Sequence, residues 1–122
     1  LTAREHDILD GPLEKSYDAI YSLDVMEHIE KENEQDYIIN LRSSLKPHGV
    51  LIVGMPSLES QTYASPVSKE GHVNCQSGVD LKAVLEKSFH NVFLFSMNDE
   101  VVHTGFTPMA HYLLAVCTEA KQ

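Results

Sequence analysis

The sequence has few cysteines and no long apolar stretch, and each shortage excludes a class of protein. Cys75 and Cys117 stand far apart without a CxxC spacing, so the pattern supports neither a zinc knuckle nor a redox motif and fits two reduced thiols. No apolar run approaches the roughly 20 residues that cross a bilayer, and residues 1–10 lack the basic-then-apolar order of a signal peptide. The sequence therefore predicts a cytoplasmic protein with no membrane partner.

Basic residues are also scarce. The chain has 9 Lys and Arg against 18 Asp and Glu, which gives a formal net charge of -9 at pH 7. Nucleic acids repel such a surface, and no Lys/Arg cluster offsets the repulsion, so no nucleic-acid partner is expected. Of the 122 residues, 43% are hydrophobic, which is a composition typical of folded proteins. This length predicts a single domain, residues 1–122.

Strand-like and helix-like patterns alternate along the chain. Apolar runs predict a short strand remnant at 6–10 and strands at 17–23, 50–53, 89–96 and 111–117. The strand at 17–23 is expected to be buried. Apolar residues at three- and four-residue spacing predict an amphipathic helix over 30–45. Ser77 is expected to cap a second helix, whose apolar face would contain Val79, Ala83, Val84 and Leu85. The long polar segments 56–77 and 97–110 predict functional loops.

This order of elements predicts an α/β fold. Alternation through the middle favours a mostly parallel sheet with crossover helices, and the last two strands, joined without a helix, favour an antiparallel hairpin at the sheet edge. Ligands bind at the carboxyl ends of strands in open α/β sheets. The segment YDAIYSLDVMEHI, residues 17–29, is therefore expected to be a strand that leads into a ligand-facing loop.

Four segments in a fixed order carry a family resemblance. They are HDILDGPL at 6–13, YDAIYSLDVMEHI at 17–29, LRSSLKPHGVLIVGMP at 41–56 and HYLLAVC at 111–117. With them the chain resembles the class I S-adenosylmethionine-dependent methyltransferases that act on small molecules. The resemblance implies a Rossmann-like methyltransferase sheet with an antiparallel last strand, S-adenosylmethionine as cofactor and methyl transfer to a small-molecule acceptor. In such an in-line displacement the protein supplies proximity, a shaped site and sometimes a base.

The beginning of the chain departs from the family pattern. None of the six glycines forms a GxGxG-like string, so the family's glycine-rich cofactor loop and its ribose-binding acidic residue have no match. The family's first strand, expected beside 17–23, and its second strand, expected between the first and the 6–10 remnant, are missing as well, and the chain begins with Leu. We therefore expect a domain truncated at the amino end, a fragment whose central strand is an uncovered edge that forms a homo-oligomer. The alternative is a catalytically inactive Rossmann-like remnant acting as a self-associating module.

The resemblance assigns cofactor contacts to Asp7, Ile8, Leu23, Asp24 and Val25. The Asp7 carboxylate would accept a hydrogen bond from the adenine amine, and the following backbone amide would meet a ring nitrogen. An Asp that simply caps a turn is the alternative for Asp7. Leu23, Asp24 and Val25 would lie at the carboxyl end of the central strand, and a helix cap is the alternative for Asp24.

Candidate residues for the acceptor side lie in the two long loops. His72 and His103 are candidate general bases, although a solvated loop histidine is the alternative for both. Five further residues are candidate substrate contacts, with a dimer contact or ordinary packing as the alternative: Tyr63, Asp99, Glu100, Phe106 and Met109.

The seven histidines raise the question of a metal. None is paired as HxH or HxxxH, so the sequence predicts no metal site, and a metal-dependent hydrolase built on histidines stays a third alternative function. His28 follows the central strand, and we interpret it as a hydrogen-bonded structural residue rather than a base. Its neighbours Met26 and Ile29 are expected in the core.

Overall fold

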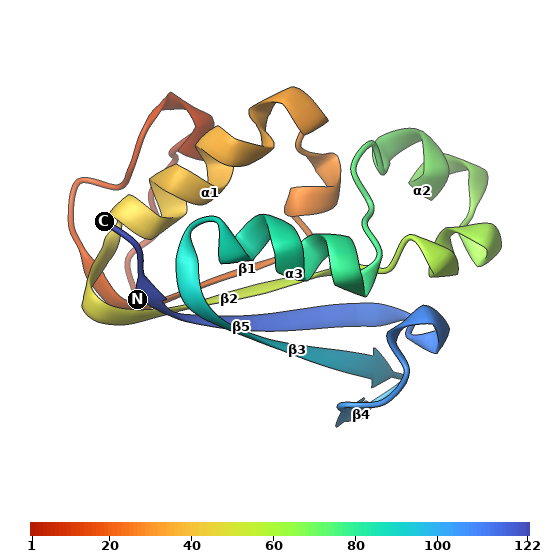
Figure 1. Ribbon diagram of the computed structural model, residues 1–122. Coiled ribbons are helices and arrows are strands. Elements are labelled where there is room, and N and C mark those ends of the chain that lie inside the picture. The colour runs from red at the N-terminus through yellow and green to blue at the C-terminus, as the bar shows by residue number, and fades with distance from the viewer.

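The molecule is built on one five-stranded sheet, seen in a computed structural model of residues 1–122 (Figure 1). The strands are β1 (Tyr17–Leu23), β2 (Leu45–Pro56), β3 (Phe89–Asn98), β4 (Val101–His103) and β5 (Tyr112–Ala120). The helices are α1 (Glu34–Ser43), α2 (Pro66–Gly71) and α3 (Gly78–Glu86). Short 3-10 helices form η1 (Ile8–Asp10), η2 (Met26–His28), η3 (Lys31–Asn33), η4 (Glu59–Tyr63) and η5 (Thr107–Met109).

The strand order is β1-β2-β5-β3-β4, and this order corrects the predicted topology. β1 pairs with β2 in parallel, whereas the β2–β5, β5–β3 and β3–β4 pairs are all antiparallel. The α/β class and the antiparallel last strand are confirmed, but the prediction of a mostly parallel sheet is wrong. The reason is that β5 lies between β2 and β3 instead of at the edge, so it makes the pairing antiparallel on both of its sides.

The two main helices form where the sequence patterns place them. Tyr37, Ile38 and Leu41 are the apolar residues of α1 that are buried. The Ser77 side chain accepts a hydrogen bond from the Asp80 backbone amide at 3.2 Å and caps α3, as predicted. The buried face of α3 consists of Leu81, Val84 and Leu85. Val79 and Ala83 are exposed, so the prediction that they belong to the apolar face was wrong. Only Leu81 and the residues three and four positions after it face the sheet.

Two strand predictions also need correction. Residues 8–10 form the 3-10 helix η1, not a strand, because the Asp7 side chain caps this turn. β2 begins at Leu45, before the predicted start at residue 50, because Tyr17 pairs with Leu45 across an irregularity before Ala19 pairs with Val50. Both long loops contain short helices, and no helix of the molecule is long and apolar enough to cross a membrane.

The sheet has one covered and one bare face. In Figure 1, α1 and α3 lie on the same side of the sheet. Tyr37, Leu51 and Phe89 are among the largest fully buried side chains of the core. No helix covers the other face, where Tyr21 is 76% and Phe93 55% exposed. β1 is an edge strand, as predicted, but it is not the buried strand that its apolar run predicted. Pairing of this edge with a second copy stays a prediction.

Candidate functional site

The carboxyl ends of β1 and β2 create a strained, closely packed corner. Asp24 directly follows β1 with φ 56°, a left-handed conformation that is uncommon outside glycine, and its amide donates to the Gly54 carbonyl at 3.0 Å. A Cβ at Gly54 would lie 2.7 Å from both Leu23 Cδ2 and Tyr112 Oη. Strain of this kind is concentrated at functional sites, where the surroundings hold the backbone in place. The corner is therefore a candidate for ligand binding.

A hollow of about 500 Å³, which we call the inner hollow, opens beside this corner. Its size lies in the range of small-molecule sites. Apolar side chains form most of its wall, and the carboxylates of Asp24 and Asp99 supply negative charge. It brings together residues that the sequence assigned to cofactor and to substrate with others that it did not assign: Leu23, Asp24, Met97, Asp99, His111, Tyr112 and Leu114.

A second hollow of about 430 Å³, the outer hollow, lies between η4 and η5. Tyr63 and Met109, two predicted substrate contacts from different loops, both line it. His111 lines both hollows, so the two cavities adjoin at this residue. The full lining is Glu59, Ser60, Thr62, Tyr63, Pro108, Met109, Ala110 and His111.

The inner hollow is electrostatically unusual. Burial raises the pKa of Tyr112 far above its ordinary value, and the adjacent Asp24 carboxylate raises it further. Tyr112 therefore keeps its proton and remains a hydrogen-bond donor at any physiological pH. Burial also raises the pKa of Glu27, an effect that the nearby Asp24 reinforces and His28 opposes.

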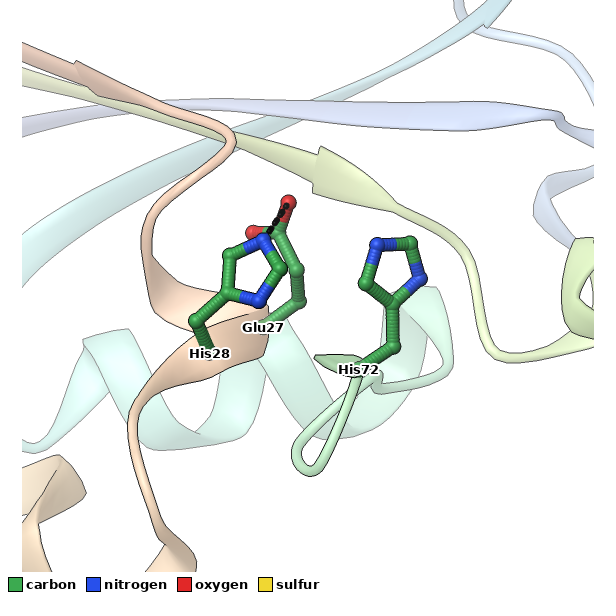
Figure 2. Close-up of side chains that lie close together, drawn as sticks. All are labelled: Glu27, His28 and His72. Atoms are coloured by element: carbon green, nitrogen blue, oxygen red, sulfur yellow. Dashed lines mark ion pairs between the residues drawn. The ribbon is translucent and has the colours of Figure 1, made fainter. Parts of the chain in front are cut away.

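Glu27, His28 and His72 form a compact cluster next to this corner (Figure 2). Glu27 and His28 belong to η2, whereas His72 comes from the turn after α2. The His28 Nε2 and Glu27 Oε1 atoms are 3.8 Å apart, and the two imidazole rings meet edge to face with centroids 5.1 Å apart. One nitrogen or oxygen atom from each residue lies within 4.8 Å of the others, so these residues could hold a metal ion.

A buried polar network holds the loop that carries His72. The Glu34 carboxylate, on α1, accepts hydrogen bonds from the Asn74 amide at 2.8 Å and from the Gln76 amide, and Lys31 Nζ lies 3.2 Å away. The Asn74 backbone amide donates to the Glu27 carbonyl at 3.0 Å. Since these contacts join helix, loop and η2, the position of His72 against His28 is set by groups that are themselves buried.

Comparison with known proteins rests on the fold. No protein-family model and no curated protein matches the chain. The solved N-methyltransferase NodS from Bradyrhizobium japonicum WM9, in complex with S-adenosyl-L-homocysteine, superposes with a TM-score of 0.59 at 21% identity, covering 93% of this chain and 52% of NodS. An S-adenosylmethionine-dependent methyltransferase of Thermotoga maritima gives a TM-score of 0.74 at 15% identity, covering 93% and 61%. The chain has a class I methyltransferase fold. It spans only half to three-fifths of these two neighbours.

Within this methyltransferase fold, the remaining predicted cofactor residues lie apart from both hollows. The Asp7 carboxylate accepts from the Leu9 amide at 2.9 Å, the capping arrangement that was its alternative, and the Ile8 carbonyl accepts from the Asn40 side chain at 2.8 Å. Val25 lies just before η2 and is 38% exposed. Their contacts with cofactor stay predictions.

The predicted bases lie in different surroundings. His72 is in the cluster and hydrogen-bonds Gln61 at 2.8 Å. His103 lies in β4, where its Nδ1 accepts from the Gly105 amide at 2.9 Å, and lines neither hollow. Glu100 and Phe106 are exposed and also lie outside the hollows. The catalytic and substrate roles of these four residues stay predictions.

His111 and Tyr112 line the inner hollow but were not predicted as site residues. They stand where β5 begins, and Tyr112 pairs with Pro56 at the end of β2. Their position follows from the strand order. β5 lies beside β2 and begins at the ligand end of the sheet, whereas the sequence predicted that this strand would lie at the edge. The interpretation of His28 as a hydrogen-bonded residue fits its 2.8 Å contact with the Gly71 carbonyl, although its side chain is 49% exposed.

Proposed function

We propose that this chain forms part of a methyltransferase that transfers the methyl group of S-adenosylmethionine to a small-molecule acceptor. The observation that carries the proposal is the inner hollow, which opens at the carboxyl end of β1 in a methyltransferase fold and is lined by Leu23 and Asp24. These are two of the residues that the family resemblance assigned to cofactor. The neighbouring methyltransferases favour this function over the inactive, self-associating remnant.

The chemistry of the inner hollow suits this cofactor. S-adenosylmethionine supplies a methyl group bound to a positively charged sulfur, and the Asp24 and Asp99 carboxylates provide the complementary charge. Leu23 and Leu114 offer apolar surface to the rest of the ligand. Burial and the Asp24 carboxylate keep the proton on the Tyr112 hydroxyl, which therefore adds a polar, uncharged group to the wall.

The outer hollow would then receive the acceptor. Tyr63 and Met109 contribute apolar walls from two separate loops, and His111 stands where the two hollows meet. An acceptor in the outer hollow would be adjacent to a cofactor in the inner one, which is the proximity that a direct displacement requires. We infer that His111, rather than a more distant histidine, is the imidazole nearest to the reacting groups.

The chain supplies only part of the expected cofactor site. Its glycines form no cofactor-binding loop, and it spans 52% and 61% of the two methyltransferases compared above. We propose that it acts as a fragment of a larger cytoplasmic catalytic domain. It would contribute the acceptor site and the part of the cofactor site that lies at the carboxyl end of β1.

Calorimetry with S-adenosylhomocysteine tests this function. We expect binding with a Kd on the order of micromolar to hundreds of micromolar, weakened about tenfold in Asp24→Asn. The matched control is Asp18→Asn, because Asp18 lies in β1, the strand that Asp24 directly follows, is exposed and pairs only with Lys46 at the surface. Absence of binding at millimolar ligand, or equal effects of the two substitutions, would overturn the proposal.

A further inference from the structure

We infer that Glu27, His28 and His72 form a binding site for a divalent transition-metal ion. The first observation is the convergence of two imidazoles and a carboxylate, Glu27 and His28 from η2 and His72 from the turn after α2 (Figure 2). One ligand atom from each residue lies within 4.8 Å of the others. Two histidines and one carboxylate are a ligand set typical of zinc and related first-row metals, whereas magnesium and calcium prefer oxygen atoms alone.

The second, independent observation is an unpartnered buried oxygen. Glu27 is 1% exposed, and its Oε2 atom has no hydrogen-bond partner. A buried carboxylate oxygen without a donor is costly, since the charge has lost its water. The other oxygen faces His28 Nε2 at 3.8 Å, too far for a hydrogen bond. A cation between these groups would satisfy the carboxylate that the protein itself leaves unpaired.

The imidazole rings of His28 and His72 each use one nitrogen in a hydrogen bond and leave the other nitrogen free to bind a metal. His28 Nδ1 lies 2.8 Å from the Gly71 carbonyl oxygen, and His72 Nδ1 lies 2.8 Å from the Gln61 side-chain oxygen. Both oxygens can only accept, so each Nδ1 carries the hydrogen and each neutral ring presents the lone pair of Nε2. This arrangement, with the outer nitrogen donating to a carbonyl, is the usual support of metal-bound histidine.

The geometry allows the ion to reach the site and to keep open coordination positions. Ligand atoms around a four-coordinate zinc ion are about 3.3 Å apart, from bond lengths of about 2.0 Å, so the side chains need to close by only about 1 to 1.5 Å. His28 is half-exposed, which gives the ion a path from solvent. Three protein ligands leave at least one position for water or for an atom of a small molecule.

Metal binding by the purified chain tests the inference without any methyl-transfer assay. After removal of metals with a chelator, the chain should bind one Zn²⁺ with a Kd of about micromolar or tighter, and Mg²⁺ should not compete. Glu27→Gln and His72→Gln should each weaken binding about 10- to 100-fold. His90→Gln is the matched control, because His90 is exposed and lies on β3 away from the cluster, and it should bind as the unaltered chain does.

A measurement on the unaltered chain covers the case in which a variant fails to fold. Zn²⁺ should protect His28 and His72 from diethylpyrocarbonate, with His90 modified at an unchanged rate. The inference would be overturned if zinc protected His28, His72 and His90 equally or if no zinc were bound. It would also be overturned if His90→Gln lost as much binding as His72→Gln. Because S-adenosylhomocysteine is absent from these experiments, their failure would leave the cofactor proposal standing, and the reverse also holds.

Discussion

Two loops leave the ligand end of the sheet, and they are held in different ways. The 57–77 loop is fastened by buried polar side chains, with Asn74 and Gln76 bonded to Glu34 on α1. The 99–111 loop contains a single buried residue, Ala110, and its other residues are exposed or half-exposed. Its ties to β3 include the Asn98 side-chain oxygen, which accepts from the His111 amide at 3.1 Å.

This difference separates a fixed part of the site from an adaptable one. A buried hydrogen-bonded network favours one geometry, and here that geometry brings His72 to His28 and Glu27. A loop with few buried contacts opens at low free-energy cost, which suits segments that admit ligands. We expect the 57–77 loop to set the chemistry and the 99–111 loop to adjust to the acceptor.

The largest effect is expected from removal of the anchor of the 57–77 loop. Glu34→Ala should lower the free energy of unfolding by about 3 kcal/mol, because two buried amides lose their acceptor. Glu100→Ala, the matched change in the 99–111 loop, should alter it by less than about 0.5 kcal/mol, since Glu100 is exposed. Urea unfolding followed by circular dichroism measures both, and similar losses would mean that the two loops do not differ as described.

Thiol reactivity compares the surroundings of the loops directly. Burial, reinforced by the Glu27 charge, raises the pKa of Cys75 to about 11. A raised pKa means less thiolate, so at pH 8 Cys75 should have about 100-fold less thiolate than an ordinary thiol and react correspondingly slowly with iodoacetamide. Its rate should climb as the pH rises toward about 11.

The comparator for this experiment is Thr104→Cys, which introduces an exposed thiol in the 99–111 loop. Peptide mass spectrometry separates the two sites, and Cys117, buried and with a pKa raised to about 12, should stay unmodified. Equal rates at Cys75 and at position 104 would show that the 57–77 loop does not shield its groups.

Ser57 joins the two loops, and removing its hydroxyl should uncouple them. Its Oγ donates to the Ala110 carbonyl at 2.5 Å and accepts from the Ser60 amide at 3.1 Å, in a fully buried position. Ser57→Ala should cost about 1 to 2 kcal/mol of unfolding free energy. Hydrogen exchange should rise at Ala110, and the exposed Ser16→Ala should change neither quantity. An unchanged exchange rate at Ala110 would mean that Ser57 does not hold the two loops together.

The smallest effect is expected at His103. Its ring accepts one hydrogen bond from the Gly105 amide within the 99–111 loop. His103→Gln should therefore lower the free energy of unfolding by no more than about 1 kcal/mol and leave the affinity for S-adenosylhomocysteine unchanged. A tenfold loss of that affinity would place His103 at the site, contrary to the position seen here.

Sequence reasoning succeeded where local pattern decides structure. The apolar spacing of α1, the Ser77 cap of α3 and the strand that ends at Leu23 all follow from neighbouring residues. It failed where distant segments meet. The insertion of β5 between β2 and β3 depends on pairing across the sheet, and missing it hid His111 and Tyr112.

The Glu27–His28–His72 cluster shows the same limit. Glu27 and His28 are adjacent in the chain, but His72 reaches them through a loop whose path is set by the buried Glu34 network. No local spacing of histidines records that contact. A buried carboxylate without a partner is visible only once the fold is known.

The most direct test of the proposed cofactor site is a two-dimensional ¹H–¹⁵N NMR titration of the chain with S-adenosylhomocysteine. Amide shifts should concentrate on Leu23, Asp24, Tyr112 and Leu114, which line the inner hollow, and leave Phe93 in the middle of the bare sheet face unchanged. Shifts centred on Phe93, or none at millimolar ligand, would contradict a cofactor site at the carboxyl end of β1.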